Sequence, residues 1–120
     1  MLEEFLGREV TAPIYAKGWV DVMIDVDRDT NGKQVNERLQ KGRKGGLPWM
    51  VILDAEGEEI VCANAEVEGH QGANIGGPRA DWEQAWFVEM LRRSKGEKVT
   101  EGELEVVAAD LAEYSKPKPK

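Results

Sequence analysis

The stretch from Gly42 to Val61 constrains the fold of this chain more than any other part of the sequence. A glycine-rich loop runs into Leu47-Pro48, which is followed by an apolar segment from Trp49 to Leu53. Proline has no backbone N–H to donate to a sheet, so it belongs at the first position of a strand or at an edge. A polar Asp-Ala-Glu-Gly turn and a second β-rich segment, Glu59 to Asn64, come next. The pattern predicts a β-hairpin whose first strand opens at the proline.

Apolar spacing and capping residues predict the other elements of a single domain over residues 1–115, followed by a disordered Lys/Pro tail at 116–120. Residues 20–26 are mostly apolar and β-branched, as in a strand buried in a parallel sheet. Thr100 and Glu103 fit a capping box that opens a C-terminal helix. The predicted order is a helix at 1–6, a helical turn at 12–17, a strand at 20–26, a helix at 30–40, hairpin strands at 49–53 and 59–64, and helices at 81–93 and 100–114.

The order of a βα unit, an antiparallel hairpin and a helix resembles the later part of the thioredoxin-like fold. This resemblance implies an α/β domain with a central mixed sheet flanked by helices, and an extra C-terminal helix, because residues 99–120 lie outside it. In that family a cis-proline opens the third core strand and faces the redox centre. The resemblance rests on Ile24-Asp25-Val26-Asp27 with Asn31-Gly32, on Gly46-Leu47-Pro48-Trp49-Met50, on Leu53-Asp54-Ala55-Glu56-Gly57 and on Asn74-Ile75-Gly76-Gly77-Pro78.

The resemblance implies thiol–disulfide exchange, but the chain has one cysteine, Cys62, and no Cys-x-x-Cys. In the family that motif lies just before the segment that residues 1–5 resemble. We therefore expect an N-terminally incomplete thiol–disulfide oxidoreductase, which lacks the first strand and the start of the first helix. Only the proline side of the site carries over, so Leu47, Pro48 and Trp49 are the expected substrate-binding residues for an extended peptide or protein thiol partner. A non-catalytic protein-binding or assembly module is the alternative.

The missing strand has an energetic consequence, because in this fold it lies between the strands predicted at 20–26 and 49–53. A strand of about five residues that buries about four apolar side chains, at roughly 1.5–3 kcal/mol each, contributes on the order of 6–12 kcal/mol. The whole stability of a domain is about 5–15 kcal/mol. We therefore expect marginal stability, or a homo-oligomer that forms through the opened sheet.

Composition limits the partners and the compartment. A net charge of -7 argues against a nucleic acid or an anionic membrane as the main partner. No apolar run approaches the ~20 residues that span a bilayer, and the acidic start lacks the basic region of a signal peptide. The chain as written is expected to be cytoplasmic, whereas a longer N-terminus would allow a periplasmic or secreted protein. No cofactor is predicted.

The segment from Asp27 to Gly32 fits the first half of an EF-hand loop, in which Asp27, Asp29 and Asn31 would supply oxygen ligands to Ca²⁺. Arg38 stands at the position where an EF-hand loop has its closing glutamate. Calcium binding is therefore a minor alternative, and no metal site is predicted. The other interpretation is a strand-to-helix loop in which Asp29 or Thr30 is the N-cap.

Single residues outside these segments favour structural roles. Cys62 lies among apolar neighbours and is expected to be an inert core residue. His70 is the only histidine and is expected on the surface of a glycine-rich loop, since a zinc site with one His and one Cys would need carboxylates or a second chain. Trp82, Trp86 and Met90 share a helix face and are expected to cover the sheet.

Overall fold

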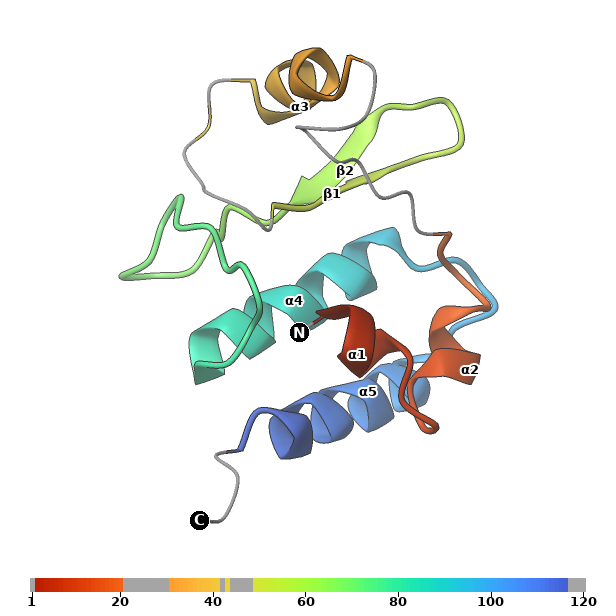
Figure 1. Cartoon of the computed structure of the whole chain (residues 1–120). Helices are drawn as coiled ribbons and strands as arrows, with labels where there is room; N and C mark the ends of the chain where they lie inside the picture. Colours follow the sequence, from red (N-terminus) through yellow and green to blue (C-terminus); the bar gives the residue numbers. More distant parts are fainter. Residues whose placement is uncertain (1, 21–30, 42, 44–48, 117–120) are drawn as a thin grey trace.

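The computed structural model describes residues 2–20, 31–41, 43 and 49–116, which form a mixed α/β arrangement of helices around a hairpin (Figure 1). The predicted helices and the hairpin are confirmed. The strand predicted at 20–26 lies outside the described residues except for Val20, which belongs to no strand and is 92% exposed. The elements are α1 (Leu2–Leu6), α2 (Ala12–Tyr15), α3 (Gly32–Gln40), β1 (Val51–Leu53), β2 (Glu59–Cys62), α4 (Asp81–Ser94) and α5 (Glu101–Tyr114).

β1 and β2 pair antiparallel, as predicted, but both are shorter than the predicted strands at 49–53 and 59–64. Their register shifts between Ile52 and Leu53, which is typical of a β-bulge and limits the length of regular pairing. Asp54 holds the turn, because its carboxylate accepts two backbone N–H groups of the turn, both at 2.9 Å. The hairpin is therefore defined at its closed end by an Asx-type turn.

The ends of the two long helices follow from local sequence. Thr100 Oγ1 accepts the Glu103 backbone N–H at 3.1 Å, and Glu103 Oε1 accepts the Thr100 N–H at 3.2 Å, so the predicted capping box of α5 is confirmed. At α4 the Glu83 carboxylate accepts the Ala80 N–H at 2.9 Å. Arg92 and Arg93 lie in the last turn of α4, where a positive charge suits the helix dipole.

The predicted N-cap of α3 is wrong. The helix begins at Gly32, and Asn31, not Asp29 or Thr30, occupies the N-cap position with a left-handed φ of 63°. Asparagine tolerates this conformation better than most residues, because its short polar side chain fits the αL region. The chain therefore turns into α3 later than a conventional cap would have placed it.

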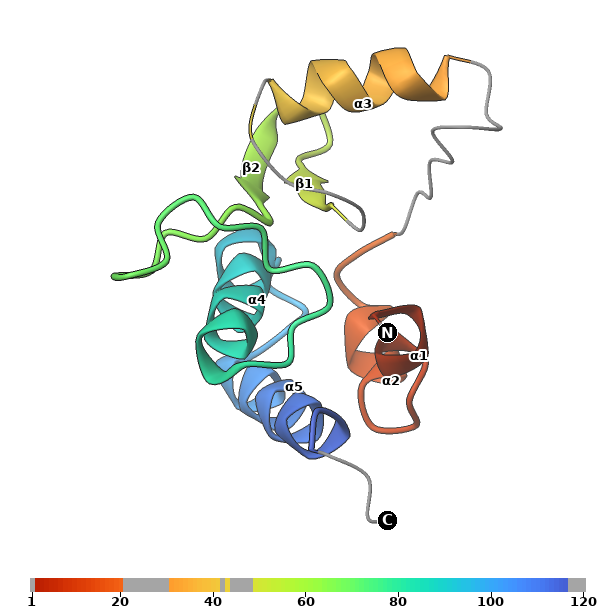
Figure 2. The same cartoon turned by 60° about the vertical axis from the view of Figure 1, so that its left-hand side comes forward.

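The helices lie on both sides of the hairpin. In both views α3 is on one side, while α4 and α1 are on the other, with α5 beyond α4 (Figures 1 and 2). The main core fills the side of α4, where α1, β2, α4 and α5 meet. No helix within the described ranges is long and apolar enough to cross a membrane. The buried residues of this core are Phe5, Ile14, Val61, Ala63, Ala65, Ile75, Trp86, Phe87, Met90, Leu91, Val99, Leu104, Val107 and Leu111.

Candidate functional site

Of the three residues expected to bind substrate, Leu47 and Pro48 lie outside the described residues and Trp49 is described. Trp49 is half-buried, and its indole N–H donates to Asn64 Oδ1 at 2.8 Å. The guanidinium carbon of Arg43 lies 5.3 Å from the centre of the Trp49 ring, within the range of a cation–π contact. The indole is thus fixed from two sides, by an amide at its edge and a cation over its face.

Arg43 joins the end of α3 to β2. Its Nη2 and Nε donate to the carbonyl oxygens of Leu39 and Gln40 at 2.7 and 2.8 Å, which caps the C-terminal end of the helix. Its two terminal nitrogens also donate to the Glu59 carboxylate at 2.6 and 2.8 Å, and this ion pair lowers the pKa of Glu59. All its bonding directions are committed to the protein, so Arg43 is a structural link and not an anion receptor.

The contacts of Arg43 and Trp49 bring together two described residues that lie on either side of 44–48. Residues 43 and 49 flank the undescribed 44–48 stretch, and they touch each other through the Arg43–Trp49 contact. Glu59 and Asn64 anchor the two side chains to β2 and to the residues that follow it. Arg43 and Trp49, the described residues on either side of 44–48, therefore lie together beside the hairpin.

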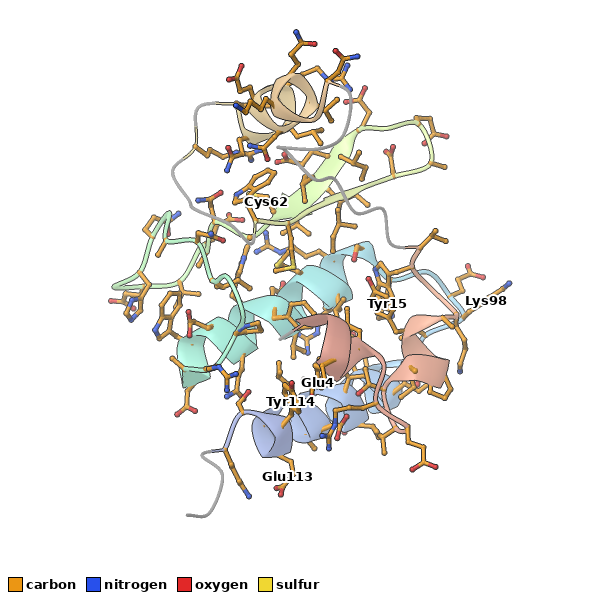
Figure 3. The ribbon with its side chains drawn as sticks, in the orientation of Figure 1. Glu4, Tyr15, Cys62, Lys98, Glu113 and Tyr114 are labelled. Carbon is orange, nitrogen blue, oxygen red and sulfur yellow. The ribbon has the colours of Figure 1, made fainter. Side chains whose placement is uncertain are left out.

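Cys62 lies at the end of β2 (Figure 3) and is 8% exposed, which confirms the prediction of a buried residue. Its surroundings are more polar than the sequence indicates. Arg43 Nη1 lies 3.3 Å from its sulfur, and the thiol donates to Asn64 Oδ1 at 3.6 Å. Arg43 is 19 residues away along the chain, so no local pattern could have predicted this contact. A second cysteine is needed for dithiol exchange, and the chain has none.

An open hollow of about 520 Å³ lies beside this cluster, with Arg43, Glu59, Cys62 and Asn64 in its wall. Arg43 is paired with Glu59, and Glu66, which also lines the hollow, is paired with Arg93, so these groups present no uncompensated charge to a ligand. In the part of the chain that is described, no buried side-chain polar atom lacks a partner. The hollow therefore shows no built ligand site.

The metal hypothesis gains no support. Asp27 and Asp29 lie outside the described residues, and Asn31 is the residue before α3. Among the residues that are described, no group of three or more His, Cys, Asp or Glu side chains could hold a metal ion. His70 is exposed, as predicted, and it stacks on Trp82 with ring centres 4.0 Å apart and planes 3° apart.

The Trp-rich face of α4 behaves as predicted at its two buried positions. Trp86 and Met90 are 3% and 1% exposed, and the Trp86 indole N–H donates to the Cys62 carbonyl oxygen at 3.0 Å. This bond fixes α4 under β2. Trp82 is only half-buried and belongs to the stack with the loop histidine.

Comparisons with known proteins do not add to these residues. No protein-family model, curated protein or solved structure matches the chain. Function therefore has to be inferred from the arrangement of the elements and from the residues around Trp49.

Proposed function

We propose that this chain is a thioredoxin-like domain that supplies the proline side of a thiol–disulfide oxidoreductase. The observation that carries the proposal is the placement of the helices relative to the hairpin. In the thioredoxin-like core the first and last helices cover one face of the sheet and the middle helix covers the other. Here α1 and α4 lie on one side of the hairpin and α3 lies on the opposite side, in agreement with that arrangement (Figures 1 and 2).

The contacts around Trp49 support the same proposal. In the family, the backbone of the proline pair binds the extended substrate. Such a loop has to be held at a defined position beside the sheet, because a binding segment that orders only on contact loses affinity. The Arg43–Trp49 contact and the Glu59 and Asn64 anchors hold the described residues on either side of 44–48, which supports the proposal.

The chemistry itself needs two thiols that this chain lacks. A nucleophilic thiolate attacks the substrate disulfide, and a second thiol then resolves the mixed disulfide and releases the reduced product. We propose that a Cys-x-x-Cys precedes the α1 segment in the intact protein. The residues of this chain would then bind and orient the substrate backbone, while the thiols carry out the exchange.

A disulfide-reduction assay tests this proposal. Protein purified from its native source is expected to catalyse reduction of insulin disulfides by dithiothreitol, and the 120-residue chain is not. Pro48→Ala in the native form is expected to slow turnover. Pro13→Ala is the matched control, because Pro13 is exposed at the start of α2. An inactive native protein, or equal effects of the two substitutions, would refute the proposed role.

A non-catalytic binding or assembly module is the second candidate, and the state of Cys62 favours it. The only thiol of the chain is buried and lies against Arg43, so no exposed thiol is offered to a partner. This candidate includes a homo-oligomer that forms through the opened sheet. Sedimentation velocity of the 120-residue chain is expected to give one discrete oligomer in that case. A monomer across the micromolar range would remove the oligomer.

A further inference from the structure

The two N-terminal helices are too short to be stable by themselves. α1 has five residues and α2 has four, whereas isolated helices below about 12–15 residues are marginal in water. Their order must therefore come from contacts with the rest of the domain. Phe5 supplies the apolar part, because it is fully buried and its ring meets Phe87 of α4 edge-on at 6.4 Å.

The polar part comes from α5. Arg8 donates to both carboxylate oxygens of Asp110 at 2.9–3.1 Å, and the Thr11 hydroxyl donates to Asp110 Oδ2 at 2.7 Å. Thr11 is 0% exposed and the Asp110 side chain is 9% exposed, whereas the Arg8 side chain is 37% exposed, so water is largely excluded at the carboxylate and reaches only the arginine. We call Arg8, Thr11 and Asp110 the clasp.

Aromatic contacts extend the clasp toward the end of α5. The ring of Tyr114 lies 5.9 Å from that of Phe5, and the guanidinium carbon of Arg8 lies 5.2 Å from the Tyr114 ring centre. Glu4 and Tyr114 are side by side between α1 and α5 (Figure 3). The last two turns of α5 therefore touch the chain on both sides of Gly7, the residue that follows α1.

Helix α5 is an unexpected place for such contacts, because residues 99–120 lie outside the resemblance to the thioredoxin-like family. An added helix could pack through apolar residues alone, and α5 does bury Leu104, Val107 and Leu111. A carboxylate that receives three hydrogen-bond donors fixes direction as well as distance. The hydrogen bonds from Arg8 and Thr11 to Asp110 therefore fix the orientation of the N-terminal segment relative to α5.

We propose that the clasp fixes the orientation of α1 and α2 through Asp110 of α5. The helix expected to follow the redox motif is then held by the C-terminal helix of the domain. Asp110 is then a positioning residue. The part that concerns the redox motif rests on the proposed function, whereas the clasp itself does not.

Amide hydrogen exchange of the 120-residue chain tests the clasp. In Asp110→Asn, peptides covering residues 4–15 are expected to exchange about tenfold faster or more, because charged hydrogen bonds are lost. Peptides covering the β1–β2 hairpin are expected to keep the wild-type rate. Glu105→Gln is the matched control, since Glu105 is an exposed carboxylate of the same helix, and it is expected to change neither region.

Two results would overturn the clasp: unchanged exchange over residues 4–15 in Asp110→Asn, or an equal acceleration in the hairpin. If Asp110→Asn fails to fold, Arg8→Lys decides, because lysine keeps the charge but cannot form the two-pronged contact. It is expected to speed exchange over residues 4–15 by a smaller factor, and no acceleration would count against the clasp.

The positioning role has a separate readout. In a form that carries both thiols, Asp110→Asn is expected to shift the redox potential of the dithiol, and Glu105→Gln is not. An unchanged potential would overturn the positioning role even if exchange is faster. Failure to find a form with two added thiols would refute the proposed function instead, and the exchange experiment would still decide the clasp.

Discussion

Replacing Trp86 with phenylalanine tests the contact that joins α4 to the hairpin. Trp86 is 3% exposed, and its indole N–H donates to the Cys62 carbonyl oxygen at 3.0 Å. Phenylalanine has no donor, so the buried carbonyl loses its partner, at about 1–3 kcal/mol. The smaller ring also removes buried apolar surface, worth about 0.8 kcal/mol per CH₂-sized group. We expect the free energy of unfolding to fall by about 2–4 kcal/mol, a large share of a stability of about 5–15 kcal/mol.

Urea denaturation followed by far-ultraviolet circular dichroism measures this change without relying on tryptophan fluorescence. Trp82→Phe is the matched control on the same helix, because Trp82 is half-buried and stacks on His70. Its expected cost is about 0.5–1 kcal/mol, the contribution of an aromatic pair. A loss below about 1 kcal/mol for Trp86→Phe, or equal losses for the two variants, would contradict the role given to the Trp86–Cys62 bond.

Three further predictions follow from buried groups. Phe5→Ala is expected to cost about 3–5 kcal/mol in urea denaturation and Phe5→Leu less than half as much, because Phe5 is fully buried between two rings; equal costs would contradict the ring contacts. The hydrogen bonds from Arg8 lower the pKa of Asp110, so its contribution to stability is present above the unfolded value of about 3.9 and is lost as pH falls through the folded value. The wild type should therefore lose more stability than Asp110→Asn below about pH 4, and parallel pH profiles would argue against the pair. Iodoacetamide should modify Cys62 slowly in the native protein and quickly in urea, since the residue is 8% exposed; equal rates would show that the thiol is accessible.

Local sequence was sufficient for the elements whose signals are only a few residues apart. The capping box of Thr100 and Glu103 predicted the start of α5. The apolar spacing of α4 correctly predicted that Trp86 and Met90 are buried, but it grouped Trp82 with them and Trp82 is only half-buried. The hairpin followed from the apolar segments and the polar turn between them. Local reasoning was wrong at the start of α3, because a left-handed Asn31 replaces an ordinary cap.

The clasp and the contacts around Trp49 could not be predicted in this way. Arg8 and Asp110 are 102 residues apart, and Arg43 reaches Glu59 across 16 residues. Such pairs form only when the hydrophobic core has brought two elements together. The sequence around either residue therefore does not indicate which distant residue it will contact. The C-terminal helix was predicted as an element, but its link to the first helix was not. The predicted mixed sheet stays a prediction, because its parallel strand falls mainly on residues 21–30.

The contacts of Arg43 and Trp49 share the residues at and after β2. Glu59 holds Arg43, and Asn64 holds Trp49. Asn64 accepts from both the Trp49 indole and the Cys62 thiol.

The most direct test of the account is the intact mass of the protein from its native source, together with a count of its thiols. We predict a mass above 13.4 kDa and at least two cysteines besides Cys62, as a Cys-x-x-Cys before α1 requires. A mass equal to that of this chain, with one thiol, would contradict dithiol exchange within one chain and leave a binding or assembly role.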